Sequence, residues 1–225
     1  MKHEMTTSDR INLWTSSQHA RDYLGRADSI PHRSEGESAL LEFIPANTER
    51  VLDLGTGDGR LLALVKAHLE EGAEAKPRQF LGLDFSPAML DAAGQRFAAD
   101  SSLSIVAHNL DEPLPALRKF DAVVSCFAIH HLIHQRKREL YAEIHALLTP
   151  GGVFCNLDHV ASPTQRLHEE FLHRTANTVE KEDPSNKLLA IEIQLQWLRE
   201  IGFVDVDCCW KWRELALMVG RRARD

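Results

Sequence analysis

Three glycines at alternate positions, Gly55, Gly57 and Gly59, follow an apolar run and precede a segment with helical spacing of apolar residues. Glycine adopts positive φ without a steric cost and lets a ligand approach the backbone closely. The N-terminus of a following helix presents free N–H groups and the positive end of its dipole. These residues predict a strand, a tight turn and a helix that together bind a ligand, with a purely structural turn as the alternative.

The spacing of these glycines indicates which ligand they bind. In dinucleotide-binding proteins a third Gly or Ala falls three positions after the second, whereas here Gly59 comes one position early and Arg60 takes the expected place. Asp53 also precedes the first glycine by two positions. The pattern Asp-x-Gly-x-Gly-x-Gly resembles the nucleotide-binding motif of the class I S-adenosylmethionine (SAM)-dependent methyltransferases. The resemblance implies that Asp53 and the three glycines bind SAM.

A second acidic residue, Asp84, ends the next apolar run, 31 positions after Asp53. A carboxylate at the end of a parallel strand accepts two hydrogen bonds from the vicinal hydroxyls of a ribose. The segment 82–90 resembles the second motif of the same family, which implies that Phe85 and Met89 form the apolar wall of an adenine site. Core filling is the alternative for Met89, and capping of the following helix is the alternative for Asp84.

The third motif departs from the usual form of the family. After the third strand the family usually has an acidic residue that accepts a hydrogen bond from the adenine amino group. When this sequence is matched to the motifs of the family, Asn109 takes that position. An amide oxygen accepts the same bond, and Leu110 would offer its backbone N–H. Arg33 is a candidate to pair with the carboxylate of SAM, and a solvated arginine before a helix is the alternative.

Three histidines, His130, His131 and His159, follow predicted strands at the edge where the family binds its methyl acceptor. An unperturbed imidazole has a pKa of about 6.5, which suits it to accept a proton from a hydroxyl or a protonated amine. His159 is the first choice as a base, because Asp158 or a neighbouring backbone carbonyl would orient its ring. The alternative for each histidine is a structural role in tying down a loop.

Strand-like and helix-like segments alternate from residue 51 onward, which predicts a parallel sheet. The last two strands are joined by a short connection, so we expect them to be antiparallel neighbours. The order resembles the methyltransferase fold, an α/β, doubly wound, mostly parallel seven-stranded sheet with a C-terminal antiparallel hairpin. The expected strands are residues 51–54, 80–84, 103–107, 120–127, 152–157, 203–210 and 214–219.

Residues 1–45 precede the first core strand and are predicted to form a helical lid, an N-terminal appendage of a single domain that covers residues 1–225. Ser34 and Glu37 have the spacing of a capping box, which predicts that Ser34 is the N-cap of a helix. Residues 162–187 interrupt the alternation and are predicted to be an inserted helix and linker. The candidate ligand contacts of the lid are Trp14, Tyr23, His32 and Arg33.

The composition narrows the classes of partner and location. A net charge of −7 argues against a nucleic-acid or anionic-membrane surface. No apolar run approaches the roughly 18 residues of a membrane span, and residues 1–5 lack the apolar core of a signal peptide. The His131–His134 pair does not predict a metal site. The cysteines do not predict one either, because none of them lies in a C-x-x-C motif. We expect a cytoplasmic protein with reduced thiols, as a monomer or homodimer.

Together these features predict an enzyme that transfers a methyl group from SAM to a small molecule and releases S-adenosylhomocysteine. The nucleophilic atom of the acceptor, O, N, S or C, is left open, because acceptor pockets in this fold come from variable segments. Two alternatives remain. One is a SAM-binding protein that does not methylate, either a cofactor-modifying enzyme or a regulatory subunit. The other is a nicotinamide dehydrogenase, against which Gly59 and Arg60 argue.

Overall fold

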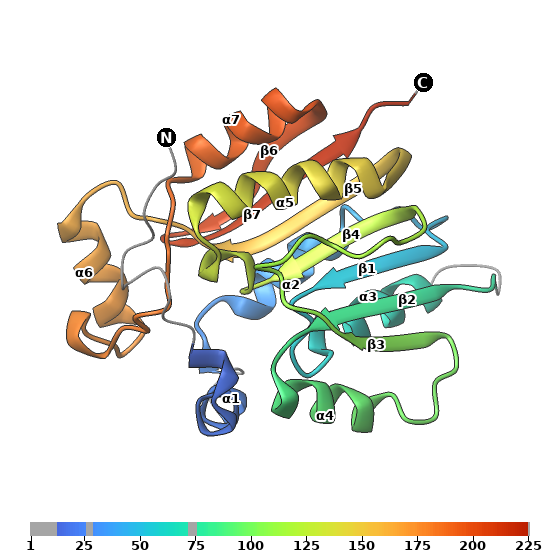
Figure 1. Ribbon diagram of the computed structural model, residues 1–225. Helices are drawn as coiled ribbons and strands as arrows, with labels where there is room; N and C mark the ends of the chain where they lie inside the picture. Colours follow the sequence, from blue (N-terminus) through green and yellow to red (C-terminus); the bar gives the residue numbers. More distant parts are fainter. Residues whose placement is uncertain (1–12, 26–28, 72–75, 225) are drawn as a thin grey trace.

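A seven-stranded sheet in the order β3-β2-β1-β4-β5-β7-β6 forms the centre of the chain (Figure 1). The computed structural model describes residues 13–25, 29–71 and 76–224. Strands β1 to β5 are mutually parallel, and β7 is antiparallel to both β5 and β6. This confirms the predicted α/β sheet with its C-terminal antiparallel hairpin. The strands are β1 (Arg50–Leu54), β2 (Gln79–Asp84), β3 (Leu103–Ala107), β4 (Phe120–Cys126), β5 (Leu148–His159), β6 (Phe203–Trp212) and β7 (Leu215–Arg222).

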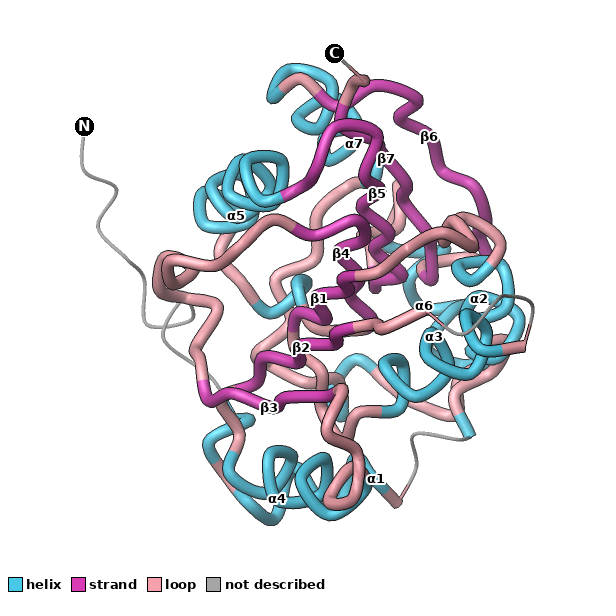
Figure 2. The backbone as a smooth tube through the Cα atoms, turned by 90° about the vertical axis from the view of Figure 1, so that its right-hand side faces the viewer, coloured by secondary structure: helices cyan, strands magenta, loops and turns pink. Residues whose placement is uncertain are grey.

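Helices cover both faces of the sheet, as Figure 2 shows in a view along its layers. On one face of the sheet, α2 and α3 pack against apolar residues of β1, β4 and β5. On the other face, α5 and α7 pack against the intervening residues of the same strands. The strands are therefore buried on both sides, which explains their continuous apolar runs. The helices are α1 (Ser17–Leu24), α2 (Arg33–Leu41), α3 (Arg60–Glu70), α4 (Pro87–Arg96), α5 (His134–Leu147), α6 (Gln165–Arg174) and α7 (Ile191–Ile201).

Two segments outside the core lie on the side where the parallel strands end (Figure 1). The first comprises α1 and a 3-10 turn, η2 (Leu13–Thr15), both within the predicted lid; residues 1–12 and 26–28 of that lid lie outside the described residues. The second is the predicted insert, which forms α6 and the 3-10 turn η5 (Val179–Lys181). These segments, rather than the sheet, are thus placed to cover a site at the strand ends.

The predicted N-cap at Ser34 is wrong. Helix α2 begins at Arg33, with His32 as its N-cap in the left-handed region at φ 60° and with no side-chain capping bond. Ser34 therefore lies inside the first turn, where its backbone is already helical. His32 instead interacts through Nδ1 with Oε1 of Glu35 at 2.9 Å, and its ring stacks on Trp212 at 4.4 Å between ring centroids.

Among the described residues, no helix combines the length and the apolar character needed to cross a membrane. All four cysteines are free. The part of the chain that the structure describes also contains no group of three His, Cys, Asp or Glu side chains arranged to hold a metal ion.

Candidate functional site

The glycine turn between β1 and α3 holds three glycines at positive φ, with values of 69°, 57° and 81° for Gly55, Gly57 and Gly59. A Cβ atom on Gly55 would lie 2.2 Å from Cβ of Ala128, and one on Gly59 would lie 2.3 Å from the ring of Phe97. A Cβ on Gly57 would meet nothing closer than 3.9 Å. Packing therefore requires glycine at positions 55 and 59, whereas the space beside Gly57 is open and could hold part of a ligand.

Asp84, at the end of β2, connects the glycine turn to the start of α4. Its Oδ2 accepts a hydrogen bond from the N–H of Gly57 at 2.8 Å, and its Oδ1 accepts one from the N–H of Ser86 at 2.8 Å. Ser86 is the N-cap of α4, but its side chain makes no capping bond. Burial raises the pKa of Asp84 despite these bonds. Each carboxylate oxygen keeps a further lone pair, so Asp84 still has acceptor capacity for a ligand.

Asp53 leaves one buried oxygen without a partner. Its Oδ2 accepts a hydrogen bond from Oγ1 of Thr56 at 2.7 Å, whereas no hydrogen bond reaches its buried Oδ1. Burial raises the pKa of this carboxyl to about 7. A buried acceptor without a partner is uncommon in proteins and indicates a missing donor. Thr56 did not stand out in the sequence; its position between the first two glycines was the available signal.

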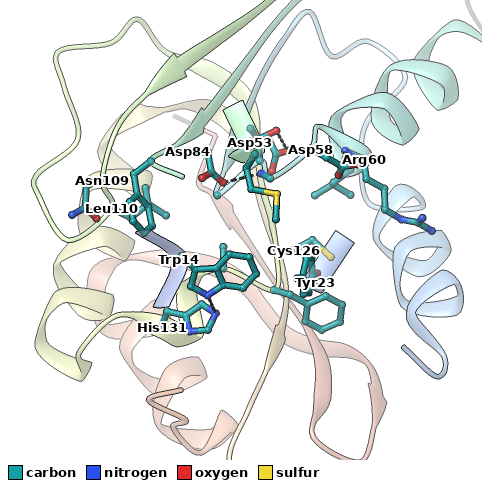
Figure 3. A pocket seen from close by; sticks show the side chains of 18 of the residues that line it. Trp14, Tyr23, Asp53, Asp58, Arg60, Asp84, Asn109, Leu110, Cys126 and His131 are labelled. Atoms are coloured by element: carbon teal, nitrogen blue, oxygen red, sulfur yellow. Dashed lines mark hydrogen bonds between the residues drawn. The ribbon is translucent and has the colours of Figure 1, made fainter. Parts of the chain in front are cut away.

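These side chains line one narrow cavity at the carboxyl ends of β1, β2 and β4 (Figure 3). Figure 3 shows Trp14, Tyr23 and His131 on one side of it and Asp53 and Asp84 on the other. Gly59 does not line the cavity. The predicted ligand-binding residues that do line it are Arg33, Asp53, Gly55, Gly57, Asp84, Phe85, Met89, Asn109 and Leu110.

Arg33 is buried at one end of this cavity, with 7% of its surface exposed, so it is not the solvated arginine of the alternative prediction. Its Nε donates to Oε1 of Glu37 at 2.7 Å, and its guanidinium also donates to the hydroxyl of Tyr23 at 3.1 Å. Arg60 donates to both oxygens of Glu37, at 2.8 and 2.9 Å. Two guanidinium groups thus converge on one carboxylate at this end of the cavity.

A second cavity, of about 620 Å³, adjoins the first and is lined by η2, α1, α6, the loop after η5 and the three predicted histidines. Nδ1 of His130 lies 2.6 Å from Oδ1 of the buried Asp158. Nε2 of His159 lies 2.7 Å from Oε2 of Glu214, whose surface is fully buried. The expectation that Asp158 orients the ring of His159 is therefore wrong. Asp158 holds His130 instead, and Glu214 holds His159.

His131 lies at the junction of the two cavities and lines both. Its Nε2 accepts a hydrogen bond from the indole N–H of Trp14 at 2.9 Å, and its Nδ1 lies 3.0 Å from Oγ of Ser185. Burial lowers the pKa of His131 well below its usual value, in agreement with a neutral ring that accepts from Trp14. Both ring nitrogens are engaged, so the geometry favours His131 as an anchor for η2 and for the insert over a role as base.

Comparisons with known proteins agree with this geometry. A family model described as a methyltransferase domain matches residues 52–154. The trans-aconitate 2-methyltransferase of Methylobacterium radiotolerans is 32% identical over 139 residues, covering 60% of this chain and 48% of that protein. The malonyl-[acyl-carrier protein] O-methyltransferase of a Marinomonas species is 31% identical over 127 residues, covering 55% and 44%. These matches support a class I SAM-dependent methyltransferase.

The solved structures show the same fold. An O-methyltransferase family protein from Burkholderia thailandensis superposes with a TM-score of 0.72 over 94% of this chain and 62% of that one, at 19% identity. Human N-acetylserotonin methyltransferase, solved in complex with SAM, gives a TM-score of 0.67 with 94% and 58% coverage at 15% identity. This chain spans about half the length of the first curated relatives, so the resemblance concerns the methyltransferase domain and not the acceptor.

In this chain, the buried Lys137 and the half-buried Lys187 brace the loop that carries His130 and His131 (the histidine loop) against the insert. Nζ of Lys137, 1% exposed, donates to the carbonyls of His130 and Leu132 at 3.1 and 2.6 Å and also to that of Lys187. Nζ of Lys187 in turn donates to the carbonyl of His131 at 3.0 Å. The short 3-10 turn η4 (Ile129–His131) is thus fixed by side chains from two other segments.

Replacing Lys137 by methionine is expected to lower the free energy of unfolding by about 2–4 kcal/mol, because three carbonyls lose their donor while the buried methylenes are kept. Urea denaturation followed by circular dichroism measures the change. The exposed Lys76, changed to methionine, is the control and is expected to stay within about 0.5 kcal/mol of the wild type. Equal unfolding free energies for Lys137→Met and wild type would show that the carbonyls are satisfied by water.

Proposed function

We propose that this chain transfers the methyl group of SAM to a small-molecule acceptor, with SAM in the first cavity and the acceptor in the second. The observation that carries the proposal is that Trp14, Tyr23, Phe127 and His131 line both cavities. The two sites therefore meet at the carboxyl end of β4, which is where a ligand binds in an open parallel sheet.

The donors and acceptors of the first cavity fit SAM. Asp84 has acceptor capacity for the ribose hydroxyls, and the orphaned Oδ1 of Asp53 suits the ammonium group. The guanidinium pair around Glu37 suits the carboxylate of the same amino acid moiety. Asn109, Leu110, Phe85 and Met89 remain the proposed adenine site.

Bound SAM supplies an electrophilic methyl group on a sulfonium, so the protein mainly has to align the nucleophile with the methyl–sulfur bond. Alignment of this kind lowers a barrier by about 7–11 kcal/mol. Trp14 and Phe127, which line both cavities, are positioned to exclude water from the junction. The bracing of η4 by Lys137 and Lys187 keeps the histidine loop, and with it the acceptor wall, in one conformation.

The first cavity is too small to admit SAM while η2 and α1 stay in place. It encloses about 90 Å³, whereas sites for molecules of this size usually measure about 300–1,000 Å³. Trp14 in η2 and Tyr23 in α1 both line this cavity. We infer that this segment acts as a lid, which moves to admit SAM and is held closed by the Trp14–His131 hydrogen bond.

Amide hydrogen exchange across residues 17–24 is expected to slow when S-adenosylhomocysteine is added, because the bound molecule gives the lid a surface to pack on. Exchange measured by mass spectrometry tests this, with α7 as the internal control that stays unchanged. Loss of the anchor in Trp14→Phe, which keeps an aromatic ring but removes the N–H donor, should raise exchange in the same residues. Unchanged exchange with ligand and in the variant would show that α1 is not a lid.

The affinity for SAM is expected to fall as the pH decreases below about 7. In the free protein burial raises the pKa of Asp53 to about 7, so at lower pH this carboxyl is protonated. The ammonium of SAM favours the carboxylate, so binding has to release the proton first, which raises the Kd by up to about tenfold per pH unit. Above pH 7 the Kd should level off, because Asp53 is already ionised.

Calorimetric titration of SAM between pH 5.5 and 8.5 measures this dependence. Asp53→Asn is expected to flatten it, and the exposed Asp91→Asn is the matched control that should keep the wild-type curve. A pH dependence that survives in Asp53→Asn would assign it to another group, of which Asp84 is the first to test because burial raises its pKa too.

The proposed function is tested by binding and turnover together. Calorimetry should show binding of SAM and S-adenosylhomocysteine but not of NADH, and an acceptor library should release S-adenosylhomocysteine. Binding of SAM without release of S-adenosylhomocysteine with any acceptor would favour the non-methylating alternative. Binding of NADH in place of SAM would favour the dehydrogenase.

A further inference from the structure

The second cavity contains two histidine–carboxylate pairs, His130–Asp158 and His159–Glu214, with distances of 2.6 and 2.7 Å. The two imidazole rings lie 5.7 Å apart between centroids, with their planes at 67°. A carboxylate accepts a hydrogen bond, so each pair places the ring proton on the nitrogen that faces the carboxylate. That leaves Nε2 of His130 and Nδ1 of His159 as lone-pair acceptors.

Neither of these two nitrogens has a hydrogen-bond partner among the residues that the structure describes. Both histidines line the cavity. A molecule that fills the cavity would therefore be bound best if it carried two hydrogen-bond donors, one for each of these nitrogens. Carboxylates that would recognise a cationic amine directly, Asp158 and Glu214, lie behind the rings and are buried.

Five apolar side chains line the cavity together with the histidines: Ile30, Phe127, Phe171, Leu172 and Leu215. Its other lining residues include the polar Ser29, Thr175, Asn177 and Asn186. The ring of Phe171 packs against His159 at 5.1 Å between centroids. The acidic residues of the lining are already engaged: Asp183 pairs with His19 at 3.3 Å, Glu182 pairs with His168 at 3.1 Å, and Asp22 accepts a hydrogen bond from Gln18 at 2.7 Å. The apolar side chains beside the two histidines therefore suit a flat, uncharged body with its polar groups gathered on the edge that faces the histidines.

We propose, on the basis of the proposed function, that the methyl acceptor is an aromatic or similarly flat apolar molecule that carries two hydroxyl groups on one edge. One hydroxyl gives its proton to Nδ1 of His159 and is methylated, while the other donates a hydrogen bond to Nε2 of His130. In this step the acceptor oxygen forms a C–O bond to the methyl carbon as the C–S bond breaks and its electron pair returns to sulfur. The proton stays on His159, whose imidazolium Glu214 stabilises, until it passes to solvent.

The division of roles between the two histidines follows from their surroundings. Burial lowers the pKa of His130, which suits this ring to accept a hydrogen bond rather than to take up a proton. Glu214, which holds His159, is itself supported by hydrogen bonds from Ser162 and from Nδ1 of His168 at 3.0 Å. This network keeps Glu214 ionised, because its partners lower its pKa below the usual value in spite of burial.

Three probes with the same ring system test the proposal: 2,3-dihydroxynaphthalene, 2-naphthol and naphthalene-2-thiol. Their Kd values are measured by calorimetry with S-adenosylhomocysteine bound, and their turnover with SAM is measured by S-adenosylhomocysteine release. We expect the dihydroxy probe to bind at least tenfold more tightly than 2-naphthol and to be the best substrate. His130→Asn, which keeps an N–H donor for Asp158 but removes Nε2, should reduce this advantage to less than threefold. His68→Gln on α3 is the matched control.

The outcomes separate this inference from the proposed function. A wild-type protein that binds no SAM would overturn the proposed function and with it the inference. A protein that binds SAM but methylates the thiol or the single hydroxyl as well as the dihydroxy probe would overturn the inference alone. If His130→Asn does not fold, the wild-type comparison of the three probes still decides.

Discussion

Replacing His159 by glutamine is expected to lower kcat for a hydroxylated acceptor by about 10²–10⁴-fold, the usual contribution of a general base. Glutamine keeps an N–H donor for Glu214, which lies 2.7 Å from Nε2 of His159 in the wild type, but removes the nitrogen that faces the cavity. The affinity for SAM should not change, because His159 does not line the first cavity. Single-turnover release of S-adenosylhomocysteine at saturating SAM measures the effect on the chemical step.

The pH dependence of kcat provides the signature of a base. In the wild type kcat should fall at low pH, because only the neutral ring of His159 accepts a proton, and this acidic limb should be absent from the residual activity of His159→Gln. His173→Gln, a histidine on α6 outside both cavities, is the matched control. A His159→Gln variant with full kcat and an unchanged profile would show that alignment alone runs the reaction.

The framework of the proposed cofactor site is local enough to be predicted from the sequence. Gly55, Gly57 and Asp84 lie where two successive strands end, and parallel strands bring their carboxyl ends to one edge. The resemblance to a known motif then named the ligand. The roles within the motif needed the structure, because only the packing of Ala128 and Phe97 distinguishes the two glycines that fill space from the one that leaves it open.

The arrangement of the histidines depended on contacts that no local pattern encodes. Asp158 was the expected partner of His159, but adjacent residues of a strand point to opposite faces of the sheet. The partner that faces His159 is Glu214, which precedes β7, and β7 is brought there by the antiparallel pairing of His159 with Leu215. The sequence separation of 55 residues is bridged only by the sheet.

The contacts of the proposed lid were equally out of reach of local patterns. The polar N-terminal segment with scattered aromatics predicted a cover, but the bond from Trp14 to His131 spans 117 residues. A capping pattern at Ser34 was outweighed by the turn that places His32 at positive φ and starts α2 one residue earlier than Ser34. Local rules therefore located the elements, whereas tertiary contacts determined which side chains meet.

Replacing Gly57 by valine is expected to weaken SAM binding by more than about 100-fold. Gly57 has a φ of 57°, which a β-branched residue adopts only with strain. A Cβ atom there would meet no protein atom closer than Sδ of Met89 at 3.9 Å, so the added side chain would point into space left for the ligand. The N–H of Gly57 also holds Asp84 at 2.8 Å, and a shift of the turn would move the proposed ribose site with it.

Gly59→Ala and Gly94→Ala complete the test by separating binding from folding. Alanine at position 59 would place Cβ 2.3 Å from the ring of Phe97, so this variant should lose thermal stability, whereas Gly94 on α4 has nothing within 4 Å and should tolerate alanine. Thermal unfolding and SAM calorimetry on all three variants give the two readouts. A Gly57→Val protein that unfolds near the wild-type temperature but no longer binds SAM would confirm the open side of the turn as the binding surface, and one that binds SAM normally would remove the glycine turn from the site.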